Sequence, residues 1–171
     1  SEITALVKDF NISMGYPLRR SSLFSLFELI FKAQLSRKED KYYAKDYLRV
    51  LRHPFVKNLK LSDQPTITRI LIHKIEEILT GKERSDLSGT LFVRLEDMVA
   101  LDDVYFLTAE MLARLGISVK RSQLCSLLKE LHQLLFSDWE AVDNFRSFSR
   151  VLERFLDVMI DKSFLKNYPL N

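Results

Sequence analysis

Three histidines and one cysteine are the side chains of this 171-residue sequence best suited to metal, acid–base or nucleophilic chemistry. His53, His73 and His132 are far apart in the chain and share no spacing that is typical of a metal site. We expect His53 at the end of a helix, His73 on the exposed side of another, and His132 beside an apolar helical stripe. Cys125 lies in a leucine-rich segment without a nearby base, so we expect a buried and unreactive thiol.

Two short motifs with charged residues also have structural explanations. Asp102 and Asp103 are typical of a helix start, where carboxylates interact favourably with the helix dipole. Gly81-Lys82 lacks the upstream glycine that a phosphate-binding loop requires. The sequence therefore predicts no catalytic residues, no metal ligands and no cofactor, and we expect that this chain is not itself an enzyme.

Basic residues are concentrated in the first third of the chain. Residues 1–60 hold twelve Lys and Arg against six Asp and Glu, a net charge of +6, whereas the remainder has a net charge of −3. Such an asymmetry can mark a surface that faces a polyanion such as DNA, or it can reflect ordinary solvated helix faces. Arg19 and Arg20 are the first candidates for phosphate contacts, because backbone N–H groups converge where a strand turns into a helix. Lys57 and Lys60 are the second. Nothing resembles a base-reading helix, so we expect weak binding without sequence preference.

The composition favours a helical domain that folds around one core. Hydrophobic residues make up 47% of the chain, while Gly and Pro number four each, which disfavours sandwiches and barrels. A single cysteine excludes an intramolecular disulfide, which fits the reducing cytoplasm where we expect the protein. We find no sufficiently long apolar stretch for a membrane span and no signal peptide.

The period of the apolar residues predicts six helices and one strand. The helices are expected to begin near Ser22, Tyr42, Pro65, Asp102, Ser118 and Ser137. Their expected N-caps are Ser21 or Ser22, Asp63, Asp102 and Ser118. Ser137 and Glu140 have the spacing of a capping box, and residues 81–89 read as a loop.

The expected strand covers about Phe10–Met14, with Tyr16 held extended by Pro17. Because a single strand cannot pair its own backbone groups, its partners are expected elsewhere, either in this fold or in a missing part of a larger protein. We expect residues 1–20 to form this strand and a turn. Residues 21–171 are expected to form a mainly α, orthogonal, bundle-like domain of about six helices. The start at Ser1 rather than Met suggests a piece of a larger protein.

Two segments in the first third of the chain resemble a known family. They are "NISMGYPL", from Asn11 to Leu18, and "YYAKDYLRVLRHPFV", which begins at Tyr42 and contains Lys45, Asp46, Leu48, Leu51, His53 and Pro54. Both resemble segments of bacterial AddB-like proteins of the Bacteroidetes type, which are inactivated superfamily I helicases with a PD-(D/E)XK nuclease domain. In that family the first segment ends a strand of the second motor domain, and the second lies early in a helical insertion. The resemblance therefore implies that residues 1–20 are a strand and turn of a neighbouring motor domain.

The resemblance implies a non-catalytic helical accessory domain in a helicase- and exonuclease-like protein of DNA double-strand-break repair. Its partners would be the other domains of the parent chain, DNA, and a helicase partner subunit, with no membrane. The ATP-binding and nuclease motifs of the family do not occur in these 171 residues. The alternative is a helical protein–protein interaction or regulatory domain that does not contact nucleic acid. Salt-sensitive DNA binding separates the two hypotheses.

Overall fold

The computed structural model describes residues 21–62 and 64–162, and this part of the chain is mainly α, as the sequence predicts. The expected strand over Phe10–Met14 and the turn that follows it lie outside the described residues. In chain order the elements are α2 (Ser22–Leu35), β1 (Tyr42–Tyr43), α3 (Ala44–Leu51), α4 (Pro54–Lys57), α5 (Pro65–Leu79), β2 (Phe92–Val93), α6 (Leu95–Ala100), α7 (Asp102–Arg114), α8 (Arg121–His132), a π-helical segment (Gln133–Ser137), α9 (Asp138–Glu140) and α10 (Phe145–Lys162).

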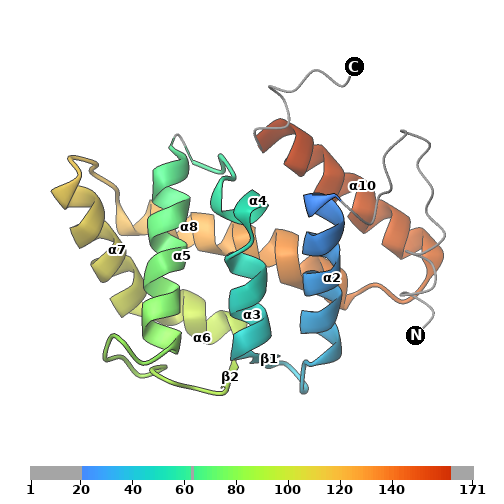
Figure 1. Ribbon diagram of the computed structural model, residues 1–171, viewed down its shortest axis with the longest axis horizontal. Coiled ribbons are helices and arrows are strands. Elements are labelled where there is room, and N and C mark those ends of the chain that lie inside the picture. The colour runs from blue at the N-terminus through green and yellow to red at the C-terminus, as the bar shows by residue number, and fades with distance from the viewer. Residues whose placement is uncertain (1–20, 63, 163–171) are drawn as a thin grey trace.

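Four helices stand side by side in one row, in the order α7, α5, α3, α2 (Figure 1). The long helical segment from α8 to α9 crosses behind this row, and α10 lies beside α2 at one end (Figure 1). The crossing arrangement agrees with the expected orthogonal packing. The core lies between the two layers, and its fully buried side chains include Leu26, Ile30, Leu71, Ile75, Leu128, Leu131 and Leu135.

Helix α2 begins where the sequence places it. The Ser21 side chain accepts a hydrogen bond from the backbone N–H of Phe24 at 3.2 Å, which satisfies one of the free N–H groups of the first turn. Leu26 and Ile30 are fully buried on the predicted apolar stripe. Leu35, the last residue of α2, is 71% exposed.

A small antiparallel sheet replaces the expected start of the second helix. Tyr42 pairs with Val93 and Tyr43 with Phe92, so α3 begins at Ala44 rather than at Tyr42. The prediction that any strand would lie between residues 10 and 16 is therefore wrong for this part of the fold. The Tyr43 and Phe92 rings pack across the sheet with centroids 5.8 Å apart. Short strands paired across some fifty residues leave no local pattern in the sequence.

Two predicted helix starts differ from the structure by a few residues. Leu101, with φ −78° and ψ 100°, is the N-cap of α7, so Asp102 is the first helical residue instead of the cap. This extended residue also separates α7 from α6, a six-residue helix that the periodicity did not predict. The fifth helix starts at Arg121 rather than near Ser118, and the backbone N–H of Lys120 donates to Gln123 Oε1 at 2.9 Å.

The start of α5 and the end of α7 are explained by local sequence signals. Pro65 occupies the first turn of α5, although the N-cap is Gln64 and Asp63 lies outside the described residues. Gly116 has φ 75°, which allows the backbone N–H of Ile117 to bond the Leu112 carbonyl at 2.9 Å. Glycine adopts this left-handed conformation without the penalty that a Cβ imposes.

The predicted capping box at Ser137 does not form, because the helix continues through this residue. Ser137 has helical dihedrals, φ −64° and ψ −39°, and its side chain makes no capping hydrogen bond. The π-helical segment that ends at Ser137 displaces carbonyl groups from the regular helix pattern. Two of these carbonyls find side-chain donors: Trp139 Nε1 donates to Leu134 O at 2.9 Å, and Gln34 Nε2 donates to Phe136 O at 3.0 Å.

The break between the two long helices lies at residues 141–144, where Asn144 forms the capping box. Asn144 Oδ1 accepts from the backbone N–H of Ser147 at 2.9 Å, and Ser147 Oγ accepts from the backbone N–H of Asn144 at 3.2 Å. These reciprocal bonds satisfy two N–H groups at the start of α10.

We expect Asn144→Ala to lower the free energy of unfolding by about 1 kcal/mol, because it removes the side-chain acceptor of a helix N-cap. Ser137→Ala should change it by less than about 0.5 kcal/mol, since Ser137 caps no helix. Urea denaturation followed by circular dichroism measures both. Equal losses for the two variants would contradict the assigned helix break.

Helix α10 is held to the bundle by an aromatic cluster centred on Trp139. The Trp139 ring lies 5.8 Å from Phe27, 5.7 Å from Phe31 and 5.7 Å from Phe155, measured between ring centroids, and 6.4 Å from Phe148. Edge-to-face contacts of this kind add to the free energy gained from apolar burial. The Arg154 side chain of α10 also pairs with Asp138 at 2.7 Å.

Candidate nucleic-acid interface

The outer face of α3 presents three cationic side chains. Lys45, Arg49 and Arg52 follow one another at i, i+4 and i+7, a spacing that places them on one side of a helix. The opposite side of α3 is buried in the core through Tyr47 and Leu51. This burial fixes the orientation of the helix and keeps the cations at the surface.

These three cations line one wall of a surface groove of about 310 Å³. The groove is completed by the end of α5 and by the chain that leads into β2, with Leu79, Thr80, Thr90 and Leu91 among its lining residues. The backbone N–H of Ala44 donates to the Leu91 carbonyl at 2.9 Å, so the sheet fixes this wall relative to α3. None of the side chains that line the groove is acidic. A ligand in this groove would therefore meet three cations, three hydroxyl-bearing side chains (Tyr43, Thr80 and Thr90) and apolar groups.

Acidic side chains near the groove are engaged in ion pairs. Arg52 Nη1 lies 3.2 Å from Glu76 Oε1. Arg49 Nη1 lies 3.2 Å from Oδ1 of Asp46, a residue that is almost completely buried. Lys45 is exposed and has no ion-pair partner within residues 21–62 and 64–162. The two arginines are thus oriented by acids that lie behind them, while Lys45 contributes an uncompensated positive charge.

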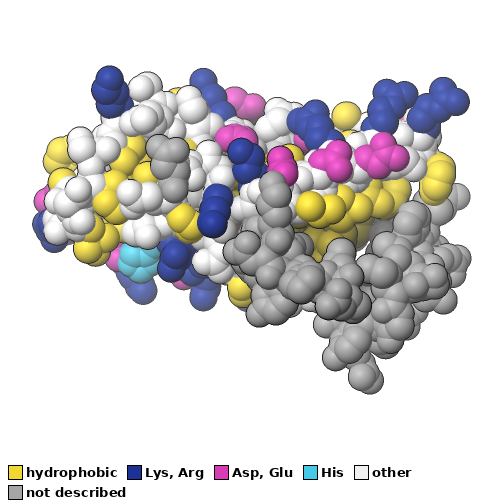
Figure 2. All heavy atoms as spheres, turned by 90° about the horizontal axis from the view of Figure 1, so that it is seen from above, with side chains coloured by type: hydrophobic (Ala, Val, Ile, Leu, Met, Phe, Trp, Pro, Cys, Tyr) yellow, Lys and Arg dark blue, Asp and Glu magenta, His cyan; other side chains and the backbone are white. Residues whose placement is uncertain are grey.

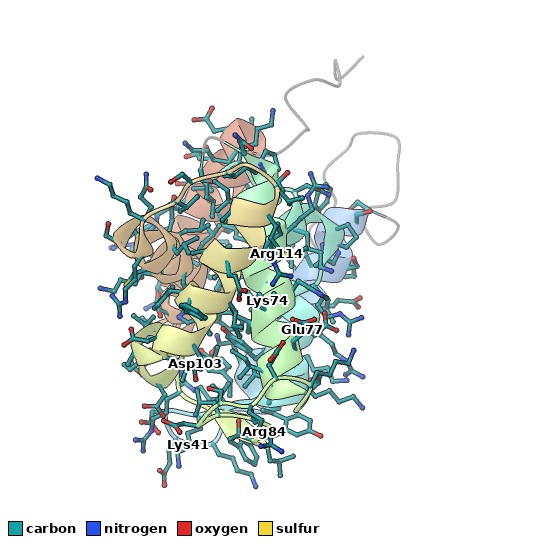
Figure 3. All side chains as sticks on the ribbon, turned by 90° about the vertical axis from the view of Figure 1, so that its left-hand side faces the viewer. Lys41, Lys74, Glu77, Arg84, Asp103 and Arg114 are labelled. Carbon is teal, nitrogen blue, oxygen red and sulfur yellow. The ribbon has the colours of Figure 1, made fainter. Side chains whose placement is uncertain are left out.

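The next acid of α5, Glu77, is neutralised in the same way. Its carboxylate lies 2.7 Å from Lys74 Nζ, and both residues are labelled on α5 in Figure 3. The hydrogen bond from Lys74 holds the pKa of Glu77 below its usual range. His73 Nε2 approaches the same carboxylate at 3.1 Å. Glu77 consequently remains ionised and paired, and it adds little net negative potential beside the groove.

The four basic residues that the sequence singled out do not line this groove. Lys57 is the last residue of α4 and is half-buried, and Lys60 is exposed just after it. The backbone N–H of Lys60 donates to the Lys162 carbonyl at 2.7 Å, which places this turn beside the end of α10. Arg19 and Arg20 lie outside the described residues. The i, i+4, i+7 spacing of Lys45, Arg49 and Arg52 is the sequence signal that could have indicated this cationic face.

A serine and a histidine lie in contact at the start of the bundle, but they are not arranged for catalysis. His53 Nδ1 accepts from the backbone N–H of Phe55 at 3.3 Å, so Nε2 carries the proton of the neutral ring. The Nε2–H group then donates to Ser25 Oγ, 2.8 Å away, and Ser25 Oγ donates to the Ser22 carbonyl at 2.8 Å. A catalytic histidine would have to accept the serine proton. His53 instead serves as the N-cap of α4, in agreement with its expected place at a helix end.

His132 is buried in the core, and its ring contacts Tyr47. The Tyr47 hydroxyl and His132 Nε2 share a hydrogen bond of 2.8 Å, while Nδ1 is buried and has no hydrogen-bond partner in the described part of the chain. Burial lowers the pKa of His132 to about 3, because a charged ring would lose its hydration there. This histidine is therefore neutral near pH 7 and structural.

The remaining candidates are Cys125 and groups of side chains that could hold a metal ion. Cys125 is half-buried rather than fully buried as the sequence predicts. Within residues 21–62 and 64–162, no three His, Cys, Asp or Glu side chains are grouped so that they could hold a metal ion. The cationic groove of α3 is thus a candidate ligand site in the part of the chain that the structure describes.

No family model, curated protein or solved structure matches this chain. Among the described residues, none of the helices combines the length and the apolar character that a membrane crossing demands. The class that the fold defines is a mainly α domain with one small sheet, and the groove defines a cationic surface on it.

Proposed function

We propose that this chain is a non-catalytic helical accessory domain of an AddB-like helicase–nuclease protein, in which it guides DNA during double-strand-break repair. The family part of this proposal rests on the two resembling segments. The second of them, which begins at Tyr42, contains β1 and α3 and therefore supplies Lys45, Arg49 and Arg52.

The observation that carries the DNA part is a groove with three cations and no acidic side chain in its lining. Phosphate contacts from Lys and Arg are independent of base sequence and position a strand without reading it. This chemistry fits a guiding role better than a sequence-specific one. On the face seen in Figure 2, both basic and acidic side chains are present.

We expect the protein to bind fluorescently labelled DNA weakly at low ionic strength, with an affinity that falls steeply as salt is added. Lys45→Ala/Arg52→Ala should reduce the magnitude of the log–log salt slope by about 2, one for each lost phosphate contact. Arg49 is kept, because its removal would leave the buried Asp46 carboxylate unpaired. The measurement is fluorescence anisotropy over a salt series.

A matched control removes the same charge from elsewhere on the surface. Arg114→Ala/Lys129→Ala changes two exposed cations of α7 and α8 and should leave the slope within experimental error of the wild type. Arg19→Ala/Arg20→Ala, in the same assay, tests the arginines that the sequence favours. Equal slopes for the groove variant and the control would refute the groove as the DNA site.

The second candidate function is a protein-interaction or regulatory domain. It is favoured by α7 and the residue after it, where Phe106 is 68% exposed and Leu115 is 53% exposed. Large exposed apolar side chains are typical of surfaces that bind other proteins. If the wild type shows no salt-dependent DNA binding at low ionic strength, this function takes first place.

A further inference from the structure

Helix α10 has a second apolar stripe beside the one that packs into the aromatic cluster. Phe148, Phe155 and Met159 form the buried stripe. The second stripe consists of Phe145, Leu152, Leu156 and Ile160. Their spacing of i, i+7, i+11 and i+15 places them on one face of a helix with 3.6 residues per turn. Its ends are exposed and its middle is half-buried: Phe145 is 57% exposed, Ile160 is 55% exposed, and between them lie Leu152 and Leu156.

Four charged residues border this second stripe on its outer side. Helical geometry places Arg146, Arg150, Glu153 and Asp157 within a narrow sector next to the stripe, with the two cations nearer the start of α10 and the two acids nearer its end. In Figure 2 basic side chains lie at the far right of the molecule and acidic ones nearer the middle, above a band of apolar side chains.

None of these four side chains has an ion-pair partner in the described part of the chain, although Arg154 of the same helix pairs with Asp138. Helix stability does not explain the pattern either. Arg146 lies in the first turn, which contains no acidic residue, whereas the helix dipole favours acids at that end. The order of charges is thus unsatisfied within residues 21–62 and 64–162 of one molecule.

The same order of charges is complementary to a second copy of itself. When two α10 helices pack antiparallel through the second stripe, a two-fold axis between positions 151 and 152 brings Arg146 opposite Asp157 of the second copy. It also brings Arg150 opposite Glu153. When a two-fold axis perpendicular to the helices relates two antiparallel copies, the charged side of the stripe on one copy faces the charged side of the stripe on the other. In a parallel pair, the charged side of one α10 would instead face the side of the other α10 that packs into the core.

We propose that α10 is the interface of a two-fold symmetric, antiparallel homodimer of this chain, with the Phe145–Ile160 stripe at its centre and the four charges at its rim. An 18-residue helix is about 27 Å long, so one helix pair buries an area at the low end for protein interfaces. The dimer is therefore weak, concentration-dependent and weakened by salt. This proposal is independent of DNA binding.

The test uses sedimentation velocity of the 171-residue chain over a range of concentrations at low salt. The wild type should show a monomer–dimer equilibrium. Arg146→Glu/Arg150→Glu and Glu153→Arg/Asp157→Arg should each raise the dissociation constant by about 10-fold or more, because every rim pair becomes repulsive. An equimolar mixture of the two variants should associate at least as tightly as the wild type, since all rim pairs are then attractive.

Arg114→Glu/Lys129→Glu reverses two charges away from α10 and should leave the dissociation constant unchanged. The four rim residues are exposed, and circular dichroism of each variant verifies that it is folded. A wild type that stays monomeric at every concentration overturns the proposal. So does a dimer that neither reversal weakens, or a mixture that fails to associate.

Discussion

Replacing Trp139 by alanine is expected to lower the free energy of unfolding by about 3–5 kcal/mol, the usual cost of removing a large buried aromatic ring. The side chain is 4% exposed and contacts aromatic rings from both α2 and α10. Its loss leaves a cavity between these helices, and it also removes the N–H donor to the Leu134 carbonyl in the π-helical segment. Burial, ring contacts and the polar contact therefore all act in the same direction.

Urea denaturation followed by circular dichroism is the suitable measurement, because Trp139 is the single tryptophan and its fluorescence disappears in the variant. Phe106→Ala is the control. Phe106 is 68% exposed, so the change should stay within about 0.5 kcal/mol. Amide hydrogen exchange should also accelerate in α10 of the Trp139 variant. A loss below about 1 kcal/mol would mean that α10 is held by other contacts.

Acidification from about pH 7.5 to about pH 5 is expected to reduce the free energy of unfolding by about 2 kcal/mol through His132 alone. The folded state holds the pKa of His132 near 3, below the ordinary value of 6.5. Between these two values the unfolded chain binds a proton that the folded chain does not. The stabilisation is thus complete above about pH 6.5 and is lost progressively as the pH falls toward 3. Burial lowers the pKa of His53 as well, so His53 acts in the same direction.

The measurement is the unfolding free energy of His132→Gln and of His73→Gln as a function of pH. Glutamine places an amide group near the position of Nε2, within reach of the Tyr47 hydroxyl, and does not titrate. His132→Gln should be less stable than the wild type at pH 7.5 but should lose about 2 kcal/mol less on acidification. His73 is 55% exposed, so His73→Gln is the surface control for the same substitution. Parallel curves for the wild type and His132→Gln would refute the assignment to this residue.

The groove of α3 shows what the sequence could and could not predict about the candidate site. The spacing of Lys45, Arg49 and Arg52 indicates one cationic helix face, and in the structure all three line one groove. The opposite wall comes from Thr80, Thr90 and Leu91, which lie some 30 to 40 residues further along the chain. Net charge alone favoured Lys57 and Lys60, which do not line the groove, because a count of charges does not say which ones converge.

Local rules determined the main outline of this protein from the sequence alone. The apolar period gave its mainly α class, Ser21 started α2, Pro65 started α5, and Gly116 ended α7. Each of these depends on hydrogen bonds or dihedral angles within a few residues, so the sequence is sufficient.

Tertiary contacts decided the features that local rules missed. The sheet joins Tyr42 to Val93, and Gln34 bonds the Phe136 carbonyl in the π-helical segment. The Gln34 amide and the Trp139 ring N–H each donate a hydrogen bond to a carbonyl of this segment. The chain therefore continues as a helix through Ser137 despite its capping-box spacing. Burial and distant hydrogen-bond donors stabilise these arrangements more than a single cap could, and neither is encoded within a few residues.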